Sequence, residues 1–145
     1  MAHRELLLAL DFGGTKHAAG LMTVGSQKWI DKRRTPALPD SDGKKDRAVV
    51  FALADELLRA HAGELKAIGV SFGGPVDWAS GRVILSHHVP GWEDTPLVEM
   101  LSQRYGVPAA MDNDATRGAT PCDPRHLLLA PHSAGARTSR HAGNR

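Results

Sequence analysis

The stretch from Leu6 to Leu21, LLLALDFGGTKHAAGL, constrains the fold of this chain more than any other part of the sequence. Leu6 to Leu10 is a short, continuous apolar run, typical of a strand buried on both faces and far too short to span a membrane. Asp11 follows it, then the glycine pair Gly13 and Gly14, and then a second apolar segment. The pattern therefore predicts a β-hairpin with a carboxylate beside its turn.

The turn of this hairpin has the groups that a phosphate-binding loop needs. Gly13 and Gly14 lack a Cβ and can adopt backbone angles closed to other residues, so that peptide N–H groups can approach an anion. Thr15 and Lys16 add a hydroxyl and a cation, and the Asp11 carboxylate suits a hydrated magnesium ion in such a site. The alternative is that the glycines form only a tight turn, which Asp11 caps.

Length and charge narrow the class of protein. A chain of 145 residues suits one domain of ordinary size. Residues 1–120 contain 14 Lys and Arg against 15 Asp and Glu, so the net charge of +2 comes from the arginines that follow. No basic face for nucleic acid is therefore expected. The single cysteine, Cys122, and the absence of a leader or a long apolar segment predict a cytoplasmic protein without disulfides or membrane contact.

The middle of the chain alternates between strands and helices. A polar strand at the sheet edge is predicted over residues 27–35, closed by Pro36. After a polar loop at 40–45, one helix has an apolar stripe formed by Val49, Val50, Leu53, Leu57 and Leu58. A buried strand is predicted over 65–72. This order of elements predicts an α/β domain.

A second glycine pair, Gly73 and Gly74, follows that strand, and residues 81–86 are expected to form a short hairpin partner. The adjacent His87 and His88 point in different directions on any regular backbone, so we expect them to face solvent or a sugar rather than share a metal. The hydroxyl of Thr95 is expected to cap a second helix that ends at Gly106.

The last predicted strand, residues 107–111, leads into a third polar cluster of Asp112, Asn113 and Asp114. In open α/β sheets, ligands bind at the carboxyl ends of strands. Asp114 would also begin the next helix, where the peptide dipoles favour its ionised form. The alternative is that Asp114 is a helix N-cap and nothing more.

These clusters together resemble the amino-terminal lobe of a sugar kinase of the ROK family (repressors, open reading frames and kinases), with bacterial glucokinases as the closest likeness. The matching motifs are LDFGGTK at 10–16, GVSFGGPVD at 69–77, GRV and HHVPGW within 81–92, and DNDAT at 112–116. The resemblance implies an α/β fold, an actin-like ATPase (ribonuclease H-like) lobe whose mixed sheet has flanking helices. It also implies ATP-dependent phosphorylation of a hexose with Mg²⁺.

The resemblance implies roles for individual residues. Asp11 resembles the carboxylate that holds Mg²⁺ through its hydration shell. The positions that resemble the ATP phosphate loop are Gly13, Gly14, Thr15 and Lys16. Gly74 and Asn113 resemble sugar-binding positions. Asp114 resembles the general base, which also contacts the sugar hydroxyl being phosphorylated.

The resemblance ends near residue 120, so we expect a kinase lobe at 1–120 and a divergent tail at 121–145. The tail has three prolines, four arginines and no aromatic residue, valine or isoleucine, which predicts disorder. Cys122, His126 and His132 supply only three candidate ligands, whereas structural zinc usually has four, and the family's own zinc motif is absent. The abrupt change supports the hypothesis of a truncated or frame-shifted kinase.

Three functions stay open at the level of sequence. A glucokinase-like chain that lacks the sugar contacts and adenosine site of the second lobe is expected to be inactive alone. A non-catalytic sugar-binding regulator is the alternative, because the family includes repressors, although no helix-turn-helix precedes the first glycine loop. The third is an inert fragment. The sequence does not select among hexoses, and a complete family member can be an oligomer.

Overall fold

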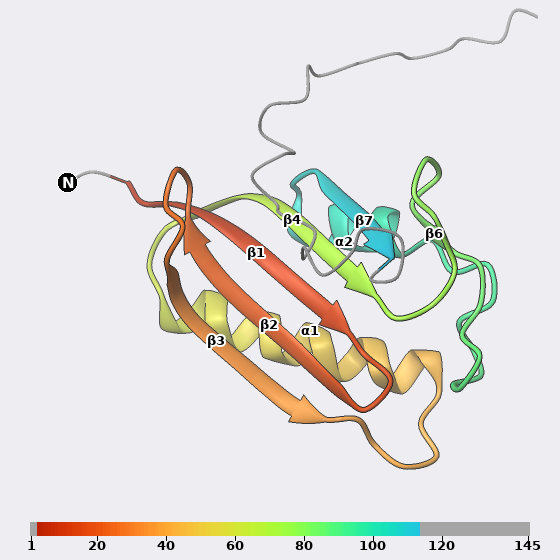
Figure 1. Cartoon of the computed structure of the whole chain (residues 1–145). Helices are drawn as coiled ribbons and strands as arrows, with labels where there is room; N and C mark the ends of the chain where they lie inside the picture. The colour runs from red at the N-terminus through yellow and green to blue at the C-terminus, as the bar shows by residue number, and fades with distance from the viewer. Residues whose placement is uncertain (1–2, 114–145) are drawn as a thin grey trace, which may run out of the picture.

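The computed structural model describes residues 3–113 of the chain. Its elements, in order, are β1 (Glu5–Phe12), β2 (Lys16–Thr23), β3 (Trp29–Pro36), α1 (Gly43–Ala60), β4 (Glu64–Phe72), β5 (Val76–Asp77), β6 (Arg82–Val83), α2 (Leu97–Tyr105) and β7 (Ala109–Asn113). The main sheet has the strand order β3-β2-β1-β4-β7, with antiparallel pairs on one side of β1 and parallel pairs on the other. The predicted mixed α/β sheet is confirmed (Figure 1).

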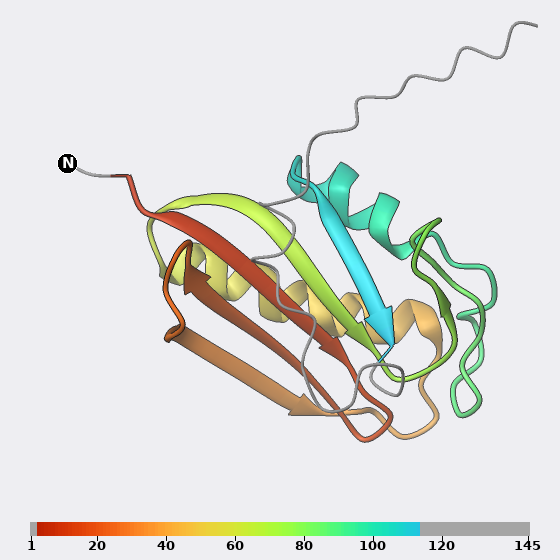
Figure 2. The same cartoon turned by 45° about the horizontal axis from the view of Figure 1, so that its top comes forward.

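Both helices lie on the same face of the sheet (Figures 1 and 2). On β1, alternate residues point to this face because successive side chains of a strand alternate. The main core joins β1 to the helices through Leu6, Leu8, Leu10, Phe12, Val50, Ala54, Leu57, Leu97 and Leu101. The opposite face carries a smaller cluster of Leu7, Met22 and Ala67. We call these the helix face and the open face.

α1 begins earlier than the sequence pattern predicts. Its first residue is Gly43, within the predicted loop at 40–45, because the Asp42 side chain accepts a hydrogen bond from the Lys45 N–H (2.8 Å) and caps the helix. Asp46 is therefore a buried residue of the first helical turn. The predicted loop at 40–45 was therefore wrong from residue 43 onward. Its polar residues favour a loop, but the Asp42 cap stabilises a helix that begins there.

The predicted cap of the second helix is also wrong. α2 has no side-chain cap, and the backbone of Thr95 instead exchanges two hydrogen bonds with Val83, at 2.8 and 3.1 Å, beside the small β5-β6 sheet. The helix ends as predicted at Gly106, which has φ 69° and donates its N–H to the Ser102 carbonyl (2.9 Å).

The strand pairing determines where the polar clusters lie. β1, β4 and β7 are parallel, so their carboxyl ends meet at one edge of the sheet. The edge strand β3 is confirmed, although Pro36 is its last residue and not a break after it. β7 runs two residues past the predicted end at 111 and includes Asp112 and Asn113. Between residues 3 and 113, no helix is long and apolar enough to cross a membrane.

Candidate functional site

The turn between β1 and β2 lies at the carboxyl edge. Gly13 donates its N–H to the Lys16 carbonyl (3.1 Å), which closes the turn. A Cβ on Gly13 would lie 2.5 Å from that same carbonyl oxygen, whereas a Cβ on Gly14 would meet nothing within 4 Å. Neither glycine has a positive φ, so the turn does not use the unusual backbone angles that the sequence predicted. Close packing explains why position 13 requires a glycine. The exposed Gly14 leaves open space at the turn.

The other predicted members of the phosphate loop are exposed. The side chains of Thr15 and Lys16 lie at the surface, next to Gly14. The Thr15 carbonyl accepts a hydrogen bond from the Ala37 N–H (2.9 Å), which fastens the turn to the segment after β3. The structure therefore presents a hydroxyl and an ammonium group on an anchored backbone.

The second glycine pair contacts this turn directly. Gly73 donates its N–H to the Phe12 carbonyl (3.0 Å), across the parallel pair of β1 and β4. Gly74 is buried, and a Cβ there would lie 3.0 Å from the Leu85 carbonyl oxygen and 3.1 Å from the Phe72 ring. The two glycine loops that the sequence singled out are thus neighbours.

A row of polar residues crosses the open face at this edge. Asp11 pairs in register with Ser71 of β4, and Ser71 pairs with Asp112 of β7. Residues in register on neighbouring strands share a face of the sheet, and Asp11 alternates with Phe12, which packs in the main core. The row therefore places two carboxylates on either side of a serine hydroxyl, on the face opposite the helices.

The third predicted cluster is only partly described. Asn113 is the last residue of β7 and pairs in register with Phe72, at the same edge as Asp11. Asp114 lies outside the described residues, and so do the candidate zinc ligands Cys122, His126 and His132. Within residues 3–113, no group of three or more His, Cys, Asp or Glu residues is placed to hold a metal ion.

The helix face of the same edge contains a polar cluster that sequence reasoning missed. The carboxylate of Asp46 accepts hydrogen bonds from the Ser41 hydroxyl (2.6 Å) and from the Trp92 indole Nε1–H (3.2 Å). Nε2 of His17 lies 3.3 Å from Oδ1 of Asp46. All four side chains are buried. The available signal was Asp46 itself, a charged residue one turn before Val50 on the buried stripe of α1.

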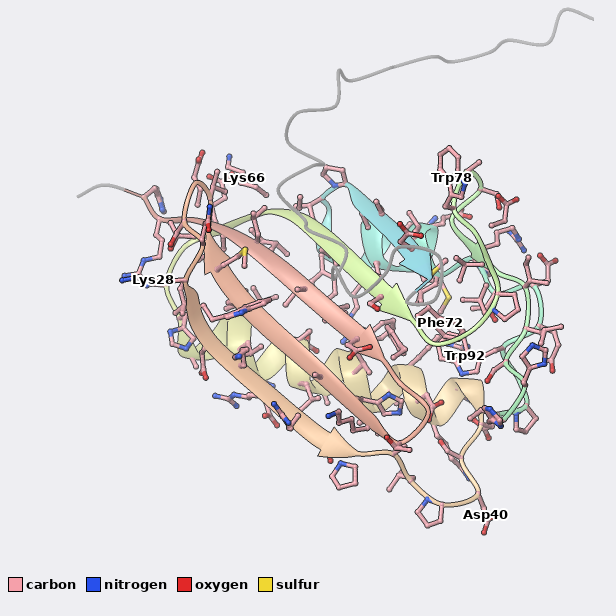
Figure 3. The ribbon with its side chains drawn as sticks, viewed as in Figure 1. Lys28, Asp40, Lys66, Phe72, Trp78 and Trp92 are labelled. Atoms are coloured by element: carbon pink, nitrogen blue, oxygen red, sulfur yellow. The ribbon has the colours of Figure 1, made fainter. Side chains whose placement is uncertain are left out.

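Aromatic rings surround this cluster. Trp92 makes edge contacts with Phe12 and Phe72, at centroid distances of 5.3 and 4.8 Å, and Figure 3 shows Phe72 and Trp92 close together beyond the end of β4. The Arg47 guanidinium lies 5.1 Å above the Trp92 ring. Burial lowers the pKa of Arg47, while the carboxylates of Asp42 and Asp46 act in the opposite direction.

A pocket opens between this cluster and the glycine loops. The polar residues and glycines that line it are Gly13, Gly14, His17, Asp46, Gly73, Ser86 and His88. His88 is exposed at this rim, which agrees with the expectation of a solvent-facing or ligand-facing loop. The edge thus offers a polar row on one face and a pocket on the other.

The chain is similar to several known proteins of one family. The glucokinase of Thermotoga maritima is 31% identical over 110 residues, covering 75% of this chain and 33% of that protein. A putative xylose repressor of a Caldicellulosiruptor species is 32% identical over 83 residues, 53% of this chain and 21% of the repressor. The chain thus spans about a third of the length of the glucokinase.

The fold matches solved structures of the same group. A ROK family glucokinase from Streptomyces griseus, solved in complex with glucose and AMPPNP, superposes with a TM-score of 0.62 at 25% identity, covering 76% of this chain and 33% of that one. The mixed sheet with flanking helices is therefore that of ROK sugar kinases, which have the actin-like ATPase fold. The sequence profile of the ROK family matches residues 7–121, and this chain belongs to the ROK family.

Proposed function

We propose that this chain provides the amino-terminal lobe of an ATP-dependent hexose kinase of the glucokinase type, acting in the cytoplasm. The observation that carries the proposal is the meeting of three parallel strand ends at one edge, β1, β4 and β7. This edge brings the Gly13-Gly14 turn, the Gly73-Gly74 loop and the end of β7 together. Phosphoryl transfer needs such convergence because the donor phosphate and the attacking hydroxyl must be aligned.

The residues at the turn fit a magnesium-bound nucleotide. Gly14 leaves room at the turn for a phosphate group, because even a Cβ there would meet nothing within 4 Å. Asp11 and Asp112 supply carboxylate oxygens in one row, and Mg²⁺ typically takes one or two carboxylates together with phosphate oxygens and waters. When bound, ATP supplies the phosphoryl group, and Mg²⁺ partly neutralises the charge of the phosphates.

Different residues of the chain would bind the phosphates, bind the sugar and accept the proton. Thr15 and Lys16 present a hydroxyl and a cation to the phosphates from the anchored turn. We assign Gly74 and Asn113 to binding of the hexose hydroxyls. Asp114 would accept the proton of the attacking hydroxyl, a role that typically contributes about 10²- to 10⁴-fold in rate.

Substitution of two carboxylates tests this proposal. In an enzyme completed by joining this lobe to the second lobe of a ROK glucokinase, we expect Asp114→Asn to lower turnover of glucose with Mg²⁺-ATP about 10²- to 10⁴-fold, while calorimetry shows largely unchanged glucose binding. Asp11→Asn should instead weaken Mg²⁺-nucleotide binding. Asp31→Asn, which changes a carboxylate on β3, serves as the control. Equal turnover of the Asp114→Asn variant and the unmodified form of that completed enzyme would contradict the assignment of the base.

A sugar-binding regulator is the second candidate, favoured by the similarity to the putative xylose repressor. The same two measurements separate the candidates. In the protein completed with a second lobe, glucose binding without turnover supports the regulator, and the absence of both supports an inert fragment.

We also propose a domain boundary at residue 120, with a divergent tail at 121–145. The ROK profile reaches residue 121, while the residues from 114 onward lie outside the described structure. Translation of the underlying DNA in its other two frames tests the hypothesis that a frameshift produced this tail. Finding motifs of the second lobe there would support it, and finding none would count against it.

A further inference from the structure

His17 is the buried residue that joins the glycine turn to the polar cluster of the helix face. It follows the turn 13–16 directly and pairs in register with Phe12, the last residue of β1. Its ring makes an edge contact with the Phe12 ring at 6.1 Å. The imidazole is 1% exposed and lines the pocket beside Gly13 and Gly14. Movement of the turn would therefore move this ring.

The imidazole lacks a hydrogen-bond partner in this structure. Neither Nδ1 nor Nε2 of His17 makes a hydrogen bond, and the 3.3 Å approach of Nε2 to Oδ1 of Asp46 is close but poorly aligned. A buried polar group without a partner is costly, so a small rotation that aligned the two side chains would be favourable. The pair can thus gain an interaction when the turn changes position.

Asp46 and the start of α1 also contact the loop 86–92. The other oxygen of Asp46 accepts the Trp92 Nε1–H, and the Gly43 N–H at the start of α1 donates to the Pro90 carbonyl (2.8 Å). A Cβ on Gly43 would lie 2.3 Å from the Gly91 carbonyl oxygen, so the helix start and the loop are in tight contact. The loop includes Ser86 and His88, which line the pocket opposite the turn.

We propose that His17 is a positioning residue that couples the two sides of the pocket. Binding of a nucleotide phosphate at the turn 13–16 aligns His17 with Asp46, and Trp92 transmits the change to the loop 86–92. A ligand produces such coupling only when it binds one of two arrangements more tightly. The proposal therefore requires that the turn bind phosphate more tightly when His17 and Asp46 are aligned. The identity of the phosphate ligand rests on the proposed function. The link between the turn 13–16 and the loop 86–92 does not depend on that function.

NMR of the ¹⁵N-labelled full chain tests the coupling, with Mg²⁺-AMPPNP as the probe. The Trp92 indole N–H reports on the loop, and the Gly13 amide reports on the turn. We expect both signals to shift with the same midpoint, while the indoles of Trp29 and Trp78, which lie outside the cluster, stay in place.

Variants of His17 distinguish positioning from simple packing. His17→Phe should keep the Gly13 response and reduce the Trp92 response at least about fivefold, the order expected for one lost hydrogen bond. His17→Gln, which restores an N–H donor near the position of Nε2, should recover it. The matched control is His61→Phe, which removes a histidine 3.0 Å from Asp31 and should behave like the unmodified chain. If His17→Phe does not fold, Asp46→Asn carries the same expectation.

Two results would overturn the coupling. One is a full Trp92 response in the His17→Phe chain, since the Phe12–Trp92 contact would then suffice. The other is a Trp92 signal that stays still in the unmodified chain while Gly13 shifts. If Mg²⁺-AMPPNP shifts neither signal, the proposed function fails, and displacement of the turn without ligand decides the link. Gly13→Ala places a Cβ 2.5 Å from the Lys16 carbonyl oxygen and so displaces the turn. It should then shift the Trp92 indole signal in the otherwise unmodified chain but not in the His17→Phe chain, and an unshifted Trp92 signal in both would refute the link.

Discussion

The two faces of the sheet differ at the edge where the candidate site lies. The open face carries a row of Asp11, Ser71 and Asp112, which come from three neighbouring parallel strands. The helix face carries His17 and Asp46 in a buried cluster closed by aromatic rings. Adjacent residues of one strand supply both faces, because Asp11 and Phe12 alternate. The groups proposed to bind a ligand and the groups packed around the loops thus begin at adjacent residues of β1.

This difference implies different responses to substitution. Changes on the helix face should reduce the free energy of unfolding, because the side chains there are buried and packed. Changes at the exposed turn and on the open face should affect ligand binding more than folding. The predictions below test that division.

The largest effect is expected at the tryptophans. Trp92 is 1% exposed and contacts Phe12, Phe72 and Asp46, whereas Trp78 is 76% exposed. Trp92→Ala should lower the free energy of unfolding by about 3–5 kcal/mol. Trp78→Ala should change it by less than about 0.5 kcal/mol. Urea denaturation followed by circular dichroism measures both, and equal losses would contradict the division between packed and exposed regions.

A smaller effect is expected within the glycine turn. A Cβ at position 13 would lie 2.5 Å from the Lys16 carbonyl oxygen, so Gly13→Ala should cost about 1–3 kcal/mol of stability. Gly14→Ala places its Cβ in open space and should leave stability nearly unchanged. If phosphate occupies that space, Gly14→Ala should weaken Mg²⁺-AMPPNP binding in calorimetry. A stable Gly13→Ala chain would show that the turn adapts.

The smallest effect concerns the contact between α1 and α2. Burial, and then the hydrogen bond to Asp55 (2.8 Å), raise the pKa of Tyr105 to about 12, and Arg104 opposes them. The neutral phenol is thus favoured in the folded state. The raised pKa of Tyr105 therefore adds to the free energy of unfolding. This contribution is fully present below about pH 10, the pKa of an unfolded tyrosine, and is lost as the pH rises through about 12.

Absorbance near the phenolate band checks this value. Tyr105 is the single tyrosine of the chain, so the titration has one source. The chain in concentrated urea provides the unfolded reference. A folded chain that titrates like the unfolded one would mean that the Tyr105–Asp55 contact does not persist in solution.

Local chemistry accounts for what the sequence predicted well. The Gly13-Gly14 pair between two apolar runs predicted the hairpin, and a polar segment closed by Pro36 predicted the edge strand β3. A contact between separate segments explains one of the errors. Thr95 has the composition of a helix cap, but its backbone pairs with Val83, a contact between segments that composition does not reveal.

The sequence by itself determined the family, the order of strands and helices, and the edge at which the glycine loops and carboxylates meet. The family follows from the resemblance of the motifs at 10–16, 69–77 and 112–116. The order of elements and their common edge follow from periodicity and from the parallel strand arrangement that such periodicity favours. Only the tertiary structure decided that His17, Asp46 and Trp92 form one cluster, because they lie on separate elements and meet through packing. Burial then determines their role, since a histidine and a carboxylate removed from water must find partners in the fold.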